Sequence, residues 1–166
     1  MNNLKNNLDE KKRFEIARVV FKMETEANLP QEFIFQMFCL AQKYEGIADL
    51  LNLWMHETNQ KEKDTIVADL QDEIEEFQNA EIIKPKYLHF DNLELIAQNV
   101  MEFKKSLRIE IERWGGISKL SKETGIPIPS LSRFLKTPAL PRRITLKKIA
   151  KALHLKESDL LSKWAA

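Results

Sequence analysis

Apolar residues recur at intervals of three and four along nearly the whole chain, and this spacing constrains the fold more than any other feature of the sequence. Such intervals place apolar side chains on one face of an α-helix, whereas no segment alternates as a half-buried strand would. Only 4 glycines and 6 prolines occur among the 166 residues, which also argues against a turn-rich β architecture. The sequence therefore predicts an all-α fold.

The first half of the chain is predicted to hold four helices. The first runs from about Asp9 to Ala27, with Phe14, Ala17 and Phe21 on one face and three further apolar residues beside them: Ile16, Val20 and Met23. Pro30 suits the first turn of a second helix, which Gly46 is expected to end. The third helix is centred on residues 47–54 and the fourth on residues 66–77, with the polar stretch 57–60 between them. We expect residues 1–80 to form a compact helical bundle.

A linker and a second helical domain are predicted to follow the bundle. The apolar pattern lapses over residues 81–90, which therefore form the expected linker. Asp91 and Glu94 have the spacing of a capping box, and this box opens a long helix that stops at residues 115–116, both glycine. A break near residues 105–106 is the alternative to one continuous helix. Residues 91–166 are expected to form the second domain.

Electric charge divides the chain at the same place. Residues 1–90 carry 11 Lys and Arg against 17 Asp and Glu, a net charge of −6, and residues 91–166 carry 15 against 8, a net charge of +7. The acidic excess includes the outer face of the fourth helix, which we expect to be a solvated surface: Asp69, Asp72, Glu73, Glu75 and Glu76. Such an asymmetry predicts two units with different partners, and the basic unit suits a polyanion.

Residues 117–136 have the spacing that two short helices need in order to cross at a steep angle. Leu120 and Thr124 are expected to line the inner face of the first helix, and Ser121 is small enough to allow close approach. Gly125 can adopt the positive φ required at the helix end. Three apolar residues complete the framework: Ile126 in the turn, and Leu131 and Phe134 on the inner side of the second helix.

This framework resembles the helix-turn-helix of the phage-repressor and Cro family, the Cro/C1 or XRE-like DNA-binding domains. The resemblance spans about residues 100–163, because residues 146–155 look like the fourth helix of that family and residues 158–161 like its fifth. The segment 115–120 also resembles the start of the motif in some antitoxins and prophage regulators. The resemblance implies that the N-terminal bundle predicted above is followed by a lambda-repressor-like domain that binds double-stranded DNA.

The resemblance also implies which residues contact DNA. In such domains the second helix of the motif lies in the major groove and the start of the first approaches phosphates. Carried over position by position, the contacts fall in three segments: Gly116, Ile117, Ser118 and Lys119; Ile128, Pro129, Ser130, Ser132, Arg133 and Lys136; and Arg142 and Arg143. Arg133 is the candidate for guanine and Ile128 for a thymine methyl group. Residues 117, 128 and 129 lack the polar side chains common in the family, so readout is expected to depend on Arg133 and on DNA shape.

The function implied is that of a transcriptional regulator, a repressor that occupies a promoter as a homodimer, since one such domain reads only a few base pairs. Two alternatives stay open. In one, the chain is an antitoxin-type module whose N-terminal bundle binds a toxin. In the other, the helix-turn-helix is only a scaffold in a helical interaction protein that does not bind DNA.

Other classes of function find little support in the sequence. No apolar run approaches the roughly 18 residues that cross a bilayer, and the polar N-terminus does not resemble a signal peptide. The single cysteine, Cys39, cannot form an internal disulfide, so we expect a cytoplasmic protein, nucleoid-associated in a bacterium or phage. His56, His89 and His154 stand in no metal-ligand spacing, and no phosphate loop or catalytic triad is present. We therefore expect no metal, no cofactor and no enzymatic activity.

Overall fold

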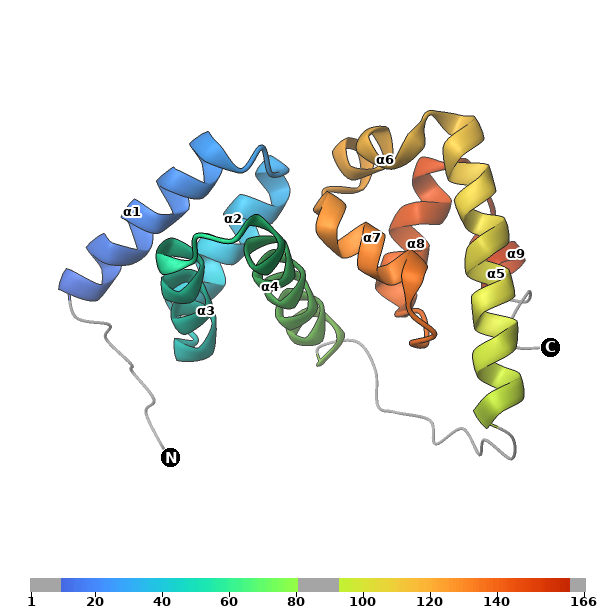
Figure 1. Cartoon of the computed structure of the whole chain (residues 1–166), viewed down its shortest axis with the longest axis horizontal. Coiled ribbons are helices and arrows are strands. Elements are labelled where there is room, and N and C mark those ends of the chain that lie inside the picture. The colour runs from blue at the N-terminus through green and yellow to red at the C-terminus, as the bar shows by residue number, and fades with distance from the viewer. Residues whose placement is uncertain (1–9, 81–92, 162–166) are drawn as a thin grey trace. The chain divides into compact units, whose positions relative to one another are not determined.

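The computed structural model describes residues 10–80 and 93–161, and all regular secondary structure within these ranges is α-helical (Figure 1). This confirms the predicted fold class. The chain divides into two compact units, residues 1–74 and residues 75–166. The division falls within the fourth helix, and the expected linker, residues 81–90, lies outside the described residues.

The first unit is built from three short helices and most of a fourth. Their bounds are α1 (Glu10–Glu26), α2 (Gln31–Ala41), α3 (Glu45–His56) and α4 (Gln60–Ala80). Each of α1, α2 and α3 packs against the other two, and the core that they share is apolar. Its most deeply buried members are Met23, Phe33, Met37, Ala41, Ile47 and Leu51.

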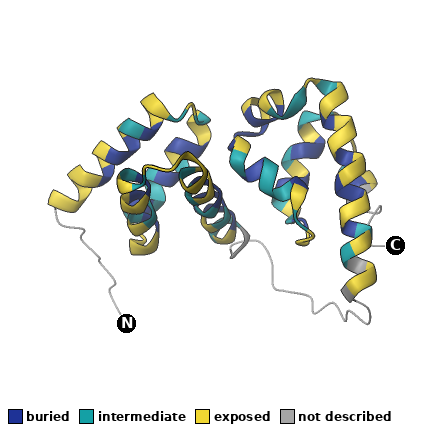
Figure 2. Ribbon diagram, viewed as in Figure 1, coloured by how far each residue is buried: buried dark blue, intermediate teal, exposed yellow. Residues whose placement is uncertain are grey.

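The buried face of α1 differs from the face that carries its phenylalanines. Ile16, Val20 and Met23 are buried together with Val19, as the helical spacing allows, whereas Phe14 and Phe21 are 72% and 67% exposed. Figure 2 shows this division as a buried and an exposed side of the same helix. An aromatic pair one heptad apart therefore lies on the surface of the unit.

The prediction that Gly46 ends the second helix is wrong. α2 ends at Ala41, where the N–H groups of Lys43 and Tyr44 both donate to the carbonyl of Leu40 at 2.9 Å. Gly46 instead lies in the first turn of α3. A helix stops where its backbone hydrogen bonds close in a tighter turn, and a glycine near that point is only a statistical marker of it.

The turn between α3 and α4 follows the predicted polar stretch. The carboxylate of Glu57 accepts hydrogen bonds from the N–H groups of Thr58 and Asn59 at 2.7 and 2.8 Å, and these bonds lower the pKa of Glu57. The side chain of Asn59 in turn accepts from the N–H of Lys61 at 2.9 Å. Asn59 thereby caps the start of α4, as an N-cap asparagine does.

The second unit contains the long helix α5 (Leu93–Trp114) followed by four shorter ones: α6 (Gly116–Thr124), α7 (Ile128–Lys136), α8 (Arg143–Ala152) and α9 (Glu157–Leu161). α5 is continuous through residues 105–106 and ends at Trp114, directly before the predicted glycine stop. It packs against α6 and α7, α6 also packs against α8, and α8 packs against α9. Residues of all five helices share one hydrophobic core, shown as the buried inner sides in Figure 2.

A buried lysine joins α5 to the loop that follows α7. Lys104 is 1% exposed, and its ammonium donates to the carbonyls of Thr137 and Ala139, each at 2.7 Å. The same ammonium lies 4.6 Å from the centre of the Phe134 ring. Burial lowers the pKa of Lys104 to about 8, because a charged group loses its hydration in the protein interior.

We expect Lys104→Met to remove a pH-dependent part of the stability. With a pKa of about 8 in the folded chain and 10.5 as the ordinary value, the unfolded state binds more protons between these pH values. The stability of the wild type therefore rises with pH across this window. The difference in unfolding free energy, wild type minus variant, should grow by about 3 kcal/mol from pH 8 to pH 10.5.

Denaturant unfolding at a series of pH values measures that difference. Lys105→Met is the matched control, because Lys105 is exposed and its removal should leave the difference unchanged with pH. A Lys104→Met difference that stays constant or shrinks as the pH rises contradicts the expectation.

Candidate nucleic-acid interface

The turn between α6 and α7 is held by buried hydrogen bonds. Gly125 ends α6 with φ of +71°, and its N–H donates to the carbonyl of Ser121 at 2.9 Å. The hydroxyl of Ser121 donates to the carbonyl of Ile126 at 2.7 Å, and that of Thr124 donates to the carbonyl of Leu120 at 2.7 Å. Because these polar groups satisfy one another inside the core, the two helices have one favoured crossing geometry.

Apolar side chains on both helices complete this framework. Leu120, Ile126 and Leu131 are almost fully buried, and Phe134 packs against the same core while remaining partly exposed. Leu135, which the sequence analysis did not single out, is buried as well. The framework positions therefore lie inward, and the remaining positions of α7 are left for the surface.

The start of α6 presents a short polar segment next to the end of α5. Ser118 and Lys119 are exposed, while Gly116 and Ile117 are partly buried. The ammonium of Lys119 donates to the carbonyl of Trp114 at 3.2 Å and lies 4.1 Å from the centre of the Trp114 ring. Lys119 thus keeps its positive charge at the surface while it covers the last turn of α5.

Glycine at position 115 makes this arrangement possible. Its φ is +138°, and a Cβ atom placed there would lie 2.7 Å from the Cδ atom of Lys119. A side chain at this position would displace Lys119, because real Cβ atoms are not found so close to another carbon. Gly115 therefore does more than help to stop α5, since it also lets Lys119 fold back over Trp114.

The outer side of α7 carries most of the residues expected to face DNA. Ile128 and Lys136 are exposed, and Pro129, Ser132 and Arg133 are partly exposed. Ser130 is different, because it is only 9% exposed and its hydroxyl has no hydrogen-bond partner among the residues that the structure describes. Ser130 was expected to contact DNA, but its side chain is buried and not presented at the surface.

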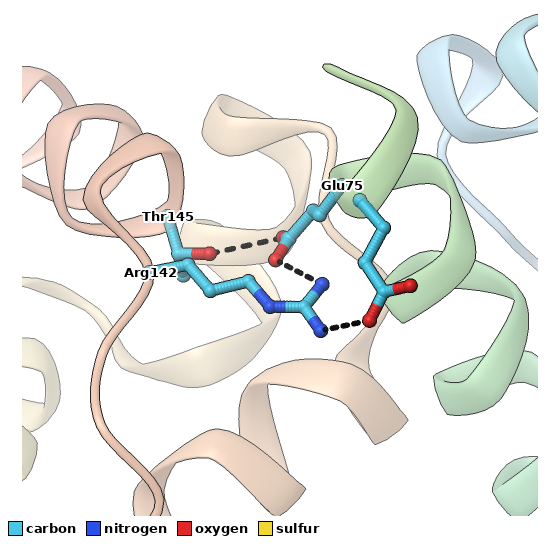
Figure 3. A network of polar contacts seen from close by, with 4 residues as sticks. Glu75, Arg142 and Thr145 are labelled. Atoms are coloured by element: carbon cyan, nitrogen blue, oxygen red, sulfur yellow. Dashed lines mark hydrogen bonds and ion pairs between the residues drawn. The ribbon is translucent and has the colours of Figure 1, made fainter. Parts of the chain in front are cut away.

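The two arginines that precede and open α8 already have carboxylate partners. Arg142 lies 3.6 Å from a carboxylate oxygen of Glu75 and 3.2 Å from one of Glu76, in the last turns of α4 (Figure 3). The hydroxyl of Thr145 donates to the other oxygen of Glu75 at 3.0 Å. Arg143 forms its own ion pair with Glu157 at 3.0 Å.

The network in Figure 3 lies within the second unit and corrects the expectation of a fully solvated acidic face on α4. The Glu75 side chain is only 7% exposed, whereas that of Glu76 is 65% exposed. A buried carboxylate needs a partner of opposite charge and further hydrogen bonds. Arg142 and Thr145 supply both, so Glu75 is part of the structure of this unit.

A hollow of about 240 Å³ lies between α5, α6 and α7. On the α7 side it is bordered by Ile128, Ser132 and Lys136, all of which were expected to face DNA. On the α5 side it is bordered by Arg108 and Glu112, which were not. No pattern within α5 distinguishes these two residues from ordinary surface charges, so only the packing of the helices brings them to the candidate interface.

The comparison with protein-family models gives a match that covers the helices from the end of α5 to α9. Residues 112–163 match the model of the Cro/C1-type HTH DNA-binding domain. The predicted resemblance is thereby confirmed for residues 112–163, a range that includes all of α6, α7 and α8. Comparison of the chain with curated proteins and with solved structures gives no match.

Neither a metal site nor a membrane-spanning helix is found among the described residues. Within residues 10–80 and 93–161, no group of three His, Cys, Asp or Glu side chains could hold a metal ion. None of the described helices is both long and apolar enough to cross a membrane. Cys39 is a free, partly buried thiol in α2.

Proposed function

We propose that the chain is a sequence-specific double-stranded-DNA-binding transcriptional regulator, a dimeric repressor that reads the major groove with the outer face of α7. The observation that carries the proposal is the exposed, cation-bearing outer side of a helix held in a Cro/C1-type helix-turn-helix. In that arrangement the second helix of the motif enters the groove and the start of the first meets the backbone. A cytoplasmic, nucleoid-associated location follows from the same proposal.

Selection from random duplex DNA with the full-length chain tests this function. A dimer should select an inverted repeat whose half-sites are about one helical turn apart. Gel shifts with the selected duplex should show binding that weakens steeply as salt is raised. A chain that binds no duplex even at low salt contradicts the proposal.

Arg133 and Lys136 are proposed to play different roles. Arg133→Ala should cost about 1–3 kcal/mol on the selected duplex and relax the sequence preference at one base pair, because a guanidinium can bond guanine through two donors. Lys136→Ala should weaken all duplexes alike and reduce the salt slope by about 1, as expected for a phosphate contact. Titrations at several salt concentrations, with matched and mismatched duplexes, separate the two effects.

Lys151→Ala is the control for these two variants. Lys151 is exposed in the last turn of α8 and lies outside the proposed face. Its loss should leave both the sequence preference and the salt slope close to those of the wild type. If Lys151→Ala and Lys136→Ala have equal effects, the assignment of α7 to the groove is lost.

Arg142 can hold a DNA phosphate only by giving up carboxylate contacts, because Glu75 and Glu76 occupy its guanidinium. We therefore expect Glu75→Gln to raise the affinity for DNA by up to about fivefold, equivalent to an ion pair worth about 1 kcal/mol. The glutamine keeps the size of the side chain and an oxygen that can accept from Thr145.

Glu73→Gln makes the same change of charge at an exposed position of the same helix and serves as the control. It should leave the affinity nearly unchanged, because Glu73 forms neither of the two ion pairs described for Arg142. Fluorescence anisotropy with the selected duplex measures both variants. Equal gains from the two variants would reduce the effect to net charge, and a loss with Glu75→Gln would exclude Arg142 as a phosphate ligand.

The exposed face of α1 supports self-association through the first unit. A second copy of α1, antiparallel about an axis between residues 17 and 18, would place Phe14 of one copy beside Phe21 of the other. It would also bring the basic start of α1, residues 11–13, near the acidic end of its partner, residues 24–26. Aromatic side chains covered in this way can supply much of the free energy of association.

We expect the double substitution Phe14→Ser and Phe21→Ser to convert the dimer to a monomer. Sedimentation velocity over a range of concentrations measures this change, and circular dichroism checks that the helices remain. Phe35→Ser is the control, because it removes a phenylalanine of similar exposure from a different helix. A chain that is monomeric before the substitutions, or dimeric after them, contradicts the proposed surface.

A further inference from the structure

The hollow between α5, α6 and α7 combines an apolar lining with a charged rim. Ile111 and Leu135 lie at its buried side, and Ile117 and Ile128 continue the apolar lining toward the surface. Arg108 and Lys136 place positive charge at its border. Protein surfaces that bind DNA are usually dominated by polar and charged residues. An apolar hollow with a charged rim is therefore an unusual feature on such a surface.

The first turn of α7 and the start of α6, which holds Ile117, are poorly equipped to hydrogen-bond a base edge. Pro127 and Pro129 have no N–H donor, and the side chains of Ile117 and Ile128 carry no polar atom. In the major groove the bases present hydrogen-bonding groups and one apolar group, the 5-methyl of thymine. Ile128, which is 39% exposed, therefore matches thymine and no other base.

The rim matches a phosphate group. The Nε atom of Arg108 lies 3.3 Å from a carboxylate oxygen of Glu112, but both side chains are more than half exposed. Ion pairs this exposed contribute little to stability, so a phosphate oxygen can replace the carboxylate at small cost. Lys136 supplies a second cation at the same hollow, and Ser132 supplies a hydroxyl donor.

We propose that this hollow, called the thymidine site below, binds one thymidine nucleotide of the bound strand. The 5-methyl group packs on Ile117 and Ile128, and the adjacent phosphate lies between Arg108 and Lys136. This inference rests on the proposed function and goes beyond it, because it names a required base and assigns a DNA contact to α5. Arg108 becomes a backbone ligand that lies outside the helix-turn-helix itself.

Removal of single methyl groups from the DNA tests the base contact. Each thymidine of the selected half-site is replaced in turn by deoxyuridine, which keeps the base pair and the backbone and removes only the methyl group. At one position the wild type should bind about fourfold more weakly, the factor expected when a single methyl-sized group is left in water. In Ile128→Ala the difference between the thymidine and deoxyuridine duplexes should fall below twofold, because only Ile117 is left to cover the methyl group.

The matched control is Ile109→Ala, which removes an exposed isoleucine of α5 that does not border the hollow. This variant should keep the full difference between thymidine and deoxyuridine. Thermal unfolding of both variants establishes that they are folded. A methyl effect that keeps its full size in Ile128→Ala, or disappears in Ile109→Ala, overturns the assignment of the thymidine site.

A neutral methylphosphonate in place of the adjacent phosphate tests the rim. It should weaken binding of the wild type severalfold, cause a smaller loss in Arg108→Ala, where Lys136 remains, and cause no further loss when Arg108→Ala and Lys136→Ala are combined. A selected duplex that shows no methyl effect at any thymidine contradicts the thymidine site, while the proposed function stands. Failure to bind any duplex contradicts both the proposed function and the thymidine site.

Discussion

The bond from the Ser121 hydroxyl to the Ile126 carbonyl is the interaction on which the second unit depends. The carbonyl belongs to a turn that is buried under two helices, where an unpaired acceptor would cost about 1–3 kcal/mol. A small hydroxyl residue is the side chain that can satisfy this acceptor and still let α7 approach α6. Once this bond and the left-handed Gly125 are in place, the direction of α7 is determined. The outward positions of the helix then follow from its periodicity.

The loop after α7 is held by a different device. Two of its carbonyls, of Thr137 and Ala139, bond the ammonium of Lys104 in α5, and Phe134 covers the same ammonium from α7. These hydrogen bonds hold the loop just before Arg142. They thereby help to position the backbone of Arg142 and Arg143 at the start of α8. The ammonium of Lys104 loses its hydration on burial, which explains why the pKa of this lysine is lowered.

The helices and the turn were predictable from sequence because they depend on local spacing. The apolar periodicity located α5 and α6, and Gly125 marked the turn between α6 and α7, since each signal involves residues a few positions apart.

What could not be predicted depends on contacts between distant residues. Glu75 looks like any other acid of α4 until Arg142 and Thr145, about seventy positions later, enclose it. In the sequence Arg108 and Lys104 both look like ordinary surface residues of α5. Only the folded unit shows that Lys104 is buried and that Arg108 borders the hollow. The face of α1 was ambiguous for the same reason, because two adjacent apolar stripes compete and tertiary packing selects one.

The two prolines at the start of α7 have a consequence for evolution. Pro127 is held at φ of −57° by its ring, and Pro129 restricts the next turn in the same way. The leading edge of the helix therefore cannot reshape its backbone to suit an altered site by induced fit. Under the proposed function, new target sequences would have to be acquired through side-chain replacements on this rigid frame, one position at a time. The frame would limit adaptation by the backbone, and little conformational entropy would be lost when the proposed complex with DNA forms.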